Sequence, residues 1–248
     1  MRLASNARAA DFRSAVHGAI FALRRPVRPS QTRFDAVLLD LDGCLVDSND
    51  AHARAWSDAL SRFGRRVPAS RIRGHIGKGG KELLRDFVTP KEHAVLASAM
   101  GAVQTERFLA RFRREVRPFP GAAAAVRRMR RAGIAVVLAS SAQPEVIQKS
   151  LALLRLDGVL TGITSAEDVE KAKPFDDIFS LAIERYGLRS ARSLAVGDTP
   201  YDVAAAHQIG VPCAAMRSGG FPVRTLRCAE HLFEGVAELW SRGRELFA

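Results

Sequence analysis

From residue 34 onward, short apolar segments alternate with segments of helical periodicity. This alternation is typical of an α/β fold, in which helices cover both faces of a parallel sheet. A helix is expected over 122–132, and Gly133 stands where a left-handed residue commonly ends a helix. We predict five strands, over residues 36–40, 134–140, 159–164, 193–197 and 212–216.

One interval interrupts the alternation. Residues 40–134 are far more than a strand–helix–strand crossover needs, so we expect an inserted element. Helices are predicted over 50–63 and 79–88, and Thr89-Pro90-Lys91-Glu92 reads as a capping box that opens a long helix toward Arg114. We therefore expect a small helical domain over 49–115, inserted into a core domain made of 34–48 and 116–248. Residues 118–121 are expected to form a stiff hinge back to the core.

Composition places the chain among globular proteins. Apolar residues make up 47% of its 248 residues and charged residues 26%. The longest run without a charged residue, 203–216, is shorter than the roughly 18 residues that span a bilayer, so no transmembrane segment is predicted. The 3 cysteines form no Cys-x-x-Cys pair, which indicates neither a disulfide framework nor a structural zinc site. We expect a protein of a reducing compartment, the cytoplasm.

Half of the net charge of +12 lies in a basic N-terminal extension, residues 1–33, which contains several arginines and one acidic residue, Asp11. The rest is spread along the chain, and no nucleic-acid-binding motif accompanies it, so no nucleic-acid partner is expected. Within the extension, residues 8–23 have the spacing of an amphipathic helix, as in an organelle transit peptide or a membrane-surface helix. We favour the alternative, a poorly ordered basic tail.

Polar side chains follow several of the predicted strands. In an open parallel sheet, ligands bind beyond the carboxyl ends of the strands, so these side chains are expected to converge on one edge. Clustered carboxylates repel one another unless a cation neutralises them, and an oxygen-rich site of this kind suits Mg²⁺. Each acid taken singly also fits a helix cap or a turn. The side chains concerned are Asp40, Asp42, Ser140, Ser141, Lys173, Asp198 and Asp202.

These residues form a recognisable set of motifs. The segments Asp40-x-Asp42-Gly43-x-Leu45-x-Asp47-Ser48, Ser140, Lys173-Pro174 and Gly197-Asp198-x-x-x-Asp202 together resemble the motifs of the haloacid dehalogenase (HAD) superfamily. The resemblance covers residues 34 to about 233. It implies a Rossmann-like core with an inserted helical cap of the C1 type, at the position of the predicted insert.

The resemblance also implies roles. Asp40 would be the nucleophile that forms an aspartyl-phosphate, and Asp42 would act as the acid and then the base, which requires a protonated carboxyl when substrate binds. Ser140 would bind a phosphoryl oxygen and Lys173 would offset negative charge. Mg²⁺ would be held by Asp40, the backbone carbonyl of Asp42 and Asp198, with Asp202 supporting the metal shell directly or through water.

Asp42 distinguishes between branches of the superfamily. The dehalogenases need no acid for their leaving group and lack this residue, so their chemistry is disfavoured. The phosphonate-cleaving branch uses a cap lysine close to the first motif, and no lysine lies between Asp40 and Arg73. Two enzyme interpretations remain, a phosphatase and a hexose-phosphate mutase resembling β-phosphoglucomutase. The stretch His52-Ala53-Arg54-Ala55-Trp56 has the register of that mutase, but related phosphatases share it, and phosphatase is favoured.

The cap carries the candidates for substrate specificity. Residues 74–81 form a glycine-rich entry to a helix that fits anion binding through backbone N–H groups, or simply a flexible connection. Candidate substrate-binding residues are Arg73, Lys78, His52 and Ser141. A closing cap excludes large substrates, so a small phosphorylated metabolite such as phosphoglycolate or a sugar phosphate is expected. A different class of function, a non-catalytic protein that binds a partner through its basic N-terminus, stays open, and nothing in the sequence sets the oligomeric state.

Overall fold

A computed structural model describes residues 33–247. Apart from Arg33, the basic extension lies outside the described residues, and so do residues 8–23, for which an amphipathic helix and a poorly ordered tail were the alternatives. The described residues form a six-stranded sheet of order β5-β4-β1-β6-β7-β8, and every pair of neighbouring strands is parallel. The predicted α/β fold with a parallel sheet is thereby confirmed. The strands are β1 (Ala36–Leu39), β4 (Ala135–Ala139), β5 (Gly162–Thr164), β6 (Ser193–Gly197), β7 (Cys213–Met216) and β8 (His231–Phe233).

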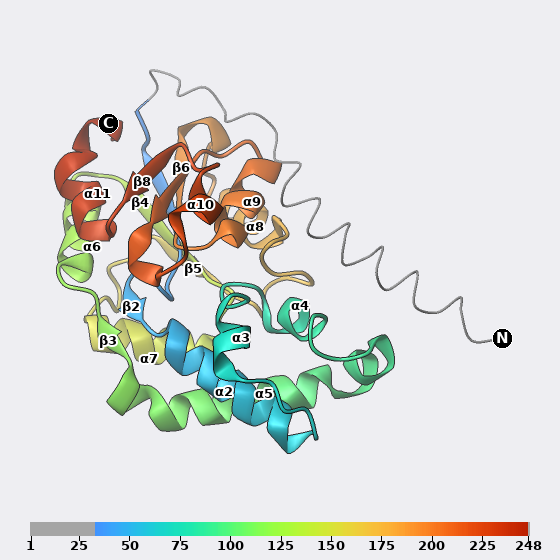
Figure 1. The fold of residues 1–248 in the computed structure, drawn as a ribbon. Helices are drawn as coiled ribbons and strands as arrows, with labels where there is room; N and C mark the ends of the chain where they lie inside the picture. The colour runs from blue at the N-terminus through green and yellow to red at the C-terminus, as the bar shows by residue number, and fades with distance from the viewer. Residues whose placement is uncertain (1–32, 248) are drawn as a thin grey trace.

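Helices cover both faces of this sheet (Figure 1). Side chains alternate along β1, so Val37 and Leu39 pack into one apolar layer and Leu38 into the other. The first layer lies against α6 (Ala122–Arg131), α7 (Pro144–Leu154) and α11 (Val236–Arg242). The second lies against α8 (Asp177–Arg185) and α9 (Pro200–Gln208). The remaining short elements are α10 (Val223–Leu226), η1 (Ser190–Arg192), η2 (Arg217–Gly219) and η3 (Arg244–Leu246).

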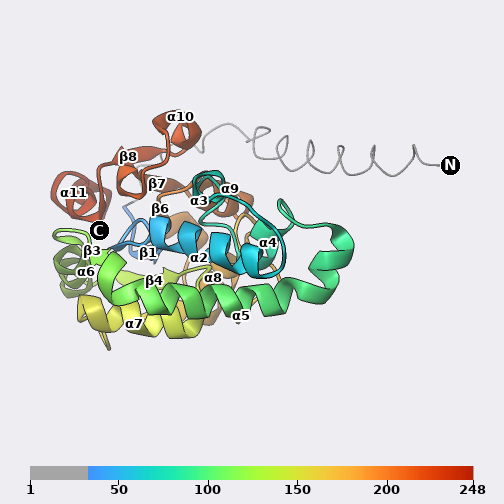
Figure 2. The same ribbon diagram turned by 60° about the horizontal axis from the view of Figure 1, so that its bottom comes forward.

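The insert predicted between the first two core strands consists of four helices. They are α2 (Asn49–Arg62), α3 (Ala69–Arg73), α4 (Gly80–Leu84) and α5 (Pro90–Glu115). α2 lies beside the long α5 at the sheet edge (Figure 2), and the four helices share their own apolar cluster, which includes Trp56, Ile72, Leu83 and Met100. We call residues 49–115 the helical insert. The capping box that opens α5 is present, because Thr89 and Glu92 each accept from the other's backbone N–H.

Several expectations differ from the structure. The helix predicted over 79–88 is shortened to α4, and α3 was not predicted. The segment 118–121 does not serve only as a hinge: β3 (Arg117–Pro118) pairs antiparallel with β2 (Val46–Asp47), so the two connections of the insert form one ribbon. β8 was also missed, since its three residues give too short a pattern. Among residues 33–247, no helix combines the length and the apolar character needed to cross a membrane.

The two ends of the described chain meet at the amino ends of the strands. The Phe34 N–H donates to the Leu246 carbonyl over 2.7 Å, and Phe34 forms a parallel bridge with Phe247. Asp40 lies beyond the other end of β1. The residues of interest are therefore at the edge opposite to the joined chain ends.

Candidate active site

Three adjacent strands bring the predicted side chains together. Asp40 follows β1, Ser140 follows the neighbouring β4, and Asp198 follows β6 on the other side of β1. The Asp40 N–H donates to the Val196 carbonyl over 2.8 Å, which continues the sheet ladder by one step beyond β1. Asp40, Ser140 and Asp198 are buried at this edge.

Lys173 is the buried cation of the site. Its Nζ lies 2.7 Å from Asp40 Oδ1 and 2.7 Å from Asp202 Oδ1, and its side chain is 1% exposed. Burial on its own lowers the pKa of Lys173, but the Asp202 and Asp40 carboxylates outweigh this effect and raise the pKa above its ordinary value. Lys173 therefore stays protonated and neutralises part of the acidic cluster.

The carboxylates remain under strong mutual repulsion. Burial, together with the charges of Asp202 and Asp42, raises the pKa of Asp40 from 3.8 to about 7, against the lowering effect of Lys173. Burial, followed by the charges of Asp202 and Asp40, raises the pKa of Asp198 well above its ordinary value. Asp198 Oδ1 is buried and has no hydrogen-bond partner among the described residues. A cation at this point would relieve both the repulsion and the missing partner.

Ligand atoms for such a cation lie close together. Among the described residues, one group of potential metal ligands consists of Asp40, Cys44 and Asp198, whose ligand atoms lie within 4.8 Å of one another. Burial and the neighbouring carboxylates raise the pKa of the Cys44 thiol well above its ordinary value, so it stays protonated and is a poor ligand. The two carboxylates remain as donors, which suits a hard cation.

Asp202 is engaged elsewhere. Its Oδ2 accepts from the N–H of Thr199 over 3.1 Å and from the Thr199 hydroxyl over 2.6 Å, which completes a capping box at the start of α9. Its Oδ1 pairs with Lys173. Asp202 thus positions Lys173 and α9, and this geometry leaves neither of its oxygens for direct contact with a metal.

Asp42 faces a histidine from the insert. His52 Nε2 lies 3.1 Å from Asp42 Oδ1, and the Ser48 hydroxyl donates to the same oxygen. Burial would raise the pKa of Asp42, but His52 and Ser48 together lower it below its ordinary value. The structure therefore favours an ionised Asp42, unlike the protonated carboxyl expected for substrate binding, because His52 lies against it.

Two residues of α5 that sequence reasoning missed hold His52 in place. Gln104 Nε2 lies 3.0 Å from His52 Nδ1, and the Phe108 ring stacks on the imidazole with 3.7 Å between centroids. These two contacts fix the orientation of the imidazole, and its Nε2 faces Asp42. Gln104 is buried and lies four residues from both Met100 and Phe108 on the buried face of α5. In the sequence, Gln104 is a polar residue at a position of the helix where the spacing predicts an apolar side chain, and this signal could have identified it.

A cavity of about 330 Å³ opens between the sheet edge and the insert. Ser140 and Ser141 lie on the core side; Ser140 Oγ accepts from the Ala142 N–H over 3.1 Å, and Ser141 Oγ is buried without a partner among the described residues. Lys78 lies on the insert side, where its Nζ donates to Asp86 Oδ2 over 2.5 Å. Of the predicted site residues, those that line the cavity are Asp40, Asp42, His52, Lys78, Ser140 and Ser141.

A sequence model of the haloacid dehalogenase-like hydrolases matches residues 34–210. The chain belongs to this family. It is 28% identical over 190 residues to a phosphoglycolate phosphatase of Cupriavidus necator, covering 74% of this chain and 81% of the relative. It is 30% identical over 171 residues to hexitol phosphatase A of Escherichia coli, covering 69% and 77%.

A solved structure shares the fold of this chain. A hydrolase from Pseudomonas syringae superposes with a TM-score of 0.79 at 24% identity, covering 86% of this chain and all of that one. This likeness shows the fold. The phosphatases among the sequence relatives support the predicted class of enzyme, a phosphoric monoester hydrolase of the HAD family.

One predicted substrate contact of this HAD-family chain is not at the cavity. Arg73 is absent from the described residues that line it. The Arg73 Nε donates to Asp50 Oδ1 over 2.7 Å, Nη2 donates to the Gly219 carbonyl, and the guanidinium lies 5.3 Å from the centroid of the Phe221 ring. These three interactions hold Arg73 between the insert and the loop after β7, away from the position expected for it.

The glycine-rich segment of the insert contacts the core directly. The Gly79 N–H donates to the Lys173 carbonyl over 2.9 Å. The buried Glu82 carboxylate, whose pKa burial raises, accepts from the Ala172 backbone. The Tyr201 hydroxyl donates to the Gly74 carbonyl over 2.8 Å. The first two contacts hold the insert against the segment that carries Lys173, and the third holds it against α9. Glu82 was not among the site residues predicted from the sequence.

Proposed function

We propose that this chain is a Mg²⁺-dependent phosphatase that hydrolyses a small phosphomonoester through an aspartyl-phosphate on Asp40. The observation that carries the proposal is a buried Asp40 that lines a cavity of about 330 Å³ and pairs with the buried Lys173. The Asp42–His52 pair faces the same cavity. A nucleophile and an acid–base pair thus meet in a space of metabolite size.

The residues present fit a Mg²⁺ ion. The ligands would be the carboxylates of Asp40 and Asp198 and the backbone carbonyl of Asp42. The unpartnered, buried Asp198 Oδ1 and the raised pKa of Asp198 both support a cation at this place. When bound, the ion supplies positive charge that screens the phosphoryl group and orients it toward Asp40.

Asp40 performs the first step. One oxygen of its carboxylate attacks phosphorus, the bond from phosphorus to the leaving oxygen breaks, and Asp40 carries the phosphoryl group. Lys173 keeps Asp40 oriented and offsets the charge on the transferring group. The Ser140 hydroxyl, whose oxygen already accepts from Ala142, is free to donate to a phosphoryl oxygen, and Ser141 is available beside it.

Asp42 and His52 handle the proton. The negative charge of an entering phosphate raises the pKa of Asp42, so the carboxyl takes up a proton, which it then gives to the leaving oxygen. In the second step Asp42 removes a proton from the water that attacks phosphorus and frees Asp40. His52, held by Gln104 and Phe108, keeps Asp42 directed toward the reacting oxygen.

The helical insert acts as the cap of the site. We propose a core domain of 34–48 and 116–247 and a cap domain of 49–115, with Lys78 contacting the part of the substrate beyond the phosphate. Relatives named for phosphoglycolate and for hexitol phosphates support a small phosphorylated metabolite as substrate. A cytoplasmic location remains our prediction.

The test is phosphate release from a panel of small phosphomonoesters, with Mg²⁺ or with EDTA, for the natural chain and Asp40→Asn. We expect metal-dependent release that Asp40→Asn abolishes, while Asp157→Asn, an exposed aspartate, retains it. Sugar-phosphate interconversion with added bisphosphate and no phosphate release would instead establish the mutase. The relatives named as phosphatases favour hydrolysis. Inactivity in both assays would favour the non-catalytic interpretation.

A further inference from the structure

The first residue of α2 connects the helical insert to Asp198. Asn49 is 2% exposed, and its Nδ2 donates to Asp198 Oδ2 over 2.9 Å and to the Gly219 carbonyl over 3.2 Å. Its own Oδ1 is buried with no hydrogen-bond partner among the described residues. A buried amide is therefore placed between a carboxylate and a backbone carbonyl, with one acceptor left over.

The surroundings of Asp198 allow one orientation of its carboxylate. A Cβ added at Gly43 or at Gly219 would collide with Asp198 Oδ2, so both glycines pack closely against that oxygen. Asn49 supplies a donor to the same atom. Oδ2 is thus enclosed and satisfied, whereas Oδ1 is the oxygen without a partner. The carboxylate is therefore held through Oδ2, and Oδ1 is left available to a cation.

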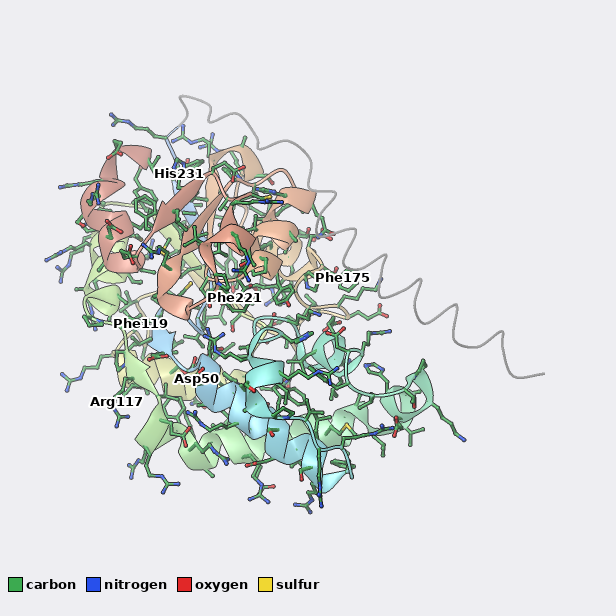
Figure 3. The ribbon with its side chains drawn as sticks, viewed as in Figure 1. Asp50, Arg117, Phe119, Phe175, Phe221 and His231 are labelled. Carbon is green, nitrogen blue, oxygen red and sulfur yellow. The ribbon has the colours of Figure 1, made fainter. Side chains whose placement is uncertain are left out.

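The Gly219 carbonyl is shared with a second residue of the insert. Arg73 Nη2 donates to it, and Arg73 Nε donates to Asp50, the residue after Asn49. Asp50 lies on α2 and Phe221 lies in the core loop that faces it (Figure 3), and the Arg73 guanidinium also contacts the Phe221 ring. A continuous set of hydrogen bonds therefore runs from Asp50 through Arg73, Gly219 and Asn49 to Asp198.

We propose that Asn49 is a positioning residue for the cation site formed by Asp40 and Asp198, and that Arg73 couples the insert to that site through Gly219. The inference rests on the proposed cation requirement. It assigns Arg73 a structural link to the cation site in place of substrate contact. Loss of the Asn49 amide removes the donor to Asp198 Oδ2, so the carboxylate is held less firmly at the cation position.

The experiment is a titration of the full chain with Mn²⁺, followed by the electron paramagnetic resonance signal of the free ion. Partners that hydrogen-bond a metal ligand typically contribute about 10- to 100-fold in metal affinity. We expect Asn49→Ala and the isosteric Asn49→Leu both to weaken Mn²⁺ binding by about tenfold or more. We expect Arg73→Met to weaken it by a smaller factor. Gln208→Ala, which removes an amide that donates to two backbone carbonyls at another place, serves as the matched control and is expected to bind as the natural chain does.

Asn49→Leu separates positioning from packing, because it keeps the branched shape and the number of heavy atoms of the side chain and replaces the polar atoms by methyl groups. Normal Mn²⁺ affinity in a folded Asn49→Leu would overturn the role of Asn49. Unchanged affinity in Arg73→Met would overturn the coupling, and this variant tests it even where Asn49 variants melt too early to be used. Asp198→Asn tests the cation site itself: if it binds Mn²⁺ as the natural chain does, the proposed metal requirement fails, whatever Asn49 does.

Discussion

The sheet edge and the helical insert contribute to the same cavity in different ways. At the sheet edge, Asp40, Ser140 and Asp198 occupy places fixed by the ends of adjacent parallel strands. In the insert, His52 and Lys78 line the cavity, and a neighbouring side chain contacts each of them. Gln104 contacts His52, and Asp86 accepts a hydrogen bond from Lys78. Backbone topology positions the first group, whereas side-chain packing positions the second.

This difference in how the residues are positioned corresponds to a difference in the roles that we propose for the core and for the insert. Charge balance and the proposed nucleophile lie in the core, where the hydrogen-bond ladder of the sheet limits movement. In the proposed function, the insert adds His52 beside Asp42 and the contacts to the rest of the substrate. Substitutions in the core are therefore expected to abolish the reaction, and substitutions in the insert to change its rate or its selectivity.

The largest effect is expected from Lys173→Met in the core. Removal of the ammonium leaves Asp40 and Asp202 buried without their counter-charge, which typically costs about 3–5 kcal/mol of stability. We expect kcat/KM to fall by about 10³-fold, since a charge-stabilising group of the transition state is lost. Denaturant unfolding and phosphate release measure the two effects. Lys171→Met, which alters an exposed lysine two residues earlier, is the control; if both variants lose the same stability, the pairing with Asp40 and Asp202 is not the cause.

His52→Asn in the insert is expected to have a smaller effect. The variant removes the group that faces Asp42, and general acid–base catalysis commonly contributes about 10²–10⁴-fold. We expect a fall in kcat near the lower limit of that range, about 10²-fold, because Asp42 remains. The pH–rate profile is the decisive measurement, since loss of His52 raises the pKa of Asp42 and moves the alkaline limb. An unshifted pH–rate profile would show that His52 takes no part in the proton transfer. His93→Asn, near the start of α5, is the control.

The two regions also differ in how far the sequence predicted them. The parallel sheet, the edge where the polar side chains gather and the convergence of Asp40, Lys173 and Asp198 followed from alternating apolar segments and from residues that stand directly after them. The long α5 followed from its capping box. These features depend on local pattern, which the sequence carries explicitly.

The rest depends on contacts between distant segments. Asn49 and Asp198 are 149 positions apart, and only the closed fold shows that one donates to the other. Arg73 had the charge expected of a substrate contact, but in the fold its guanidinium donates to Asp50 and to the Gly219 carbonyl. Residues 118–121 were predicted to form a hinge, but Pro118 lies in the exposed two-residue strand β3 and pairs with Val46, where its missing N–H is tolerated.

A third prediction concerns pH and the cation. The pKa of Asp40 is raised from 3.8 to about 7, so the folded state holds its proton more tightly than the unfolded state does. This contribution to stability is fully present below about pH 4 and is lost as the pH rises through about 7. In the proposed function a divalent cation would take the place of the proton, so Mg²⁺ is expected to raise the melting temperature more at pH 8 than at pH 5. Thermal melts at the two pH values measure this, and an equal Mg²⁺ shift at both would contradict it; Asp198→Asn should abolish the difference.

The smallest effects are expected within the insert, from substitutions of two basic residues, Lys78 and Arg73. The sequence predicted substrate binding for both, and we now propose it for Lys78 alone. Lys78→Met is expected to raise KM by about tenfold with little change in kcat, because a charged contact to bound substrate is lost. Arg73→Met is expected to leave KM within about twofold and to raise the Mg²⁺ concentration needed for half-maximal activity. Steady-state kinetics at varied substrate and varied Mg²⁺ separate the two. The opposite pattern would return Arg73 to the substrate side of the cavity.

The bridge between Phe34 and Phe247 has a practical consequence. Because these residues pair at the amino ends of the strands, a short linker can join them without crossing the cavity at the opposite edge. A circularly permuted chain, closed there and opened at the turn around Gly187, would keep the order of the sheet while it changes the order of synthesis. In such a chain β6, with Asp198, is made before β1, with Asp40, and a solid support attached near the joined ends leaves the cavity facing the solution.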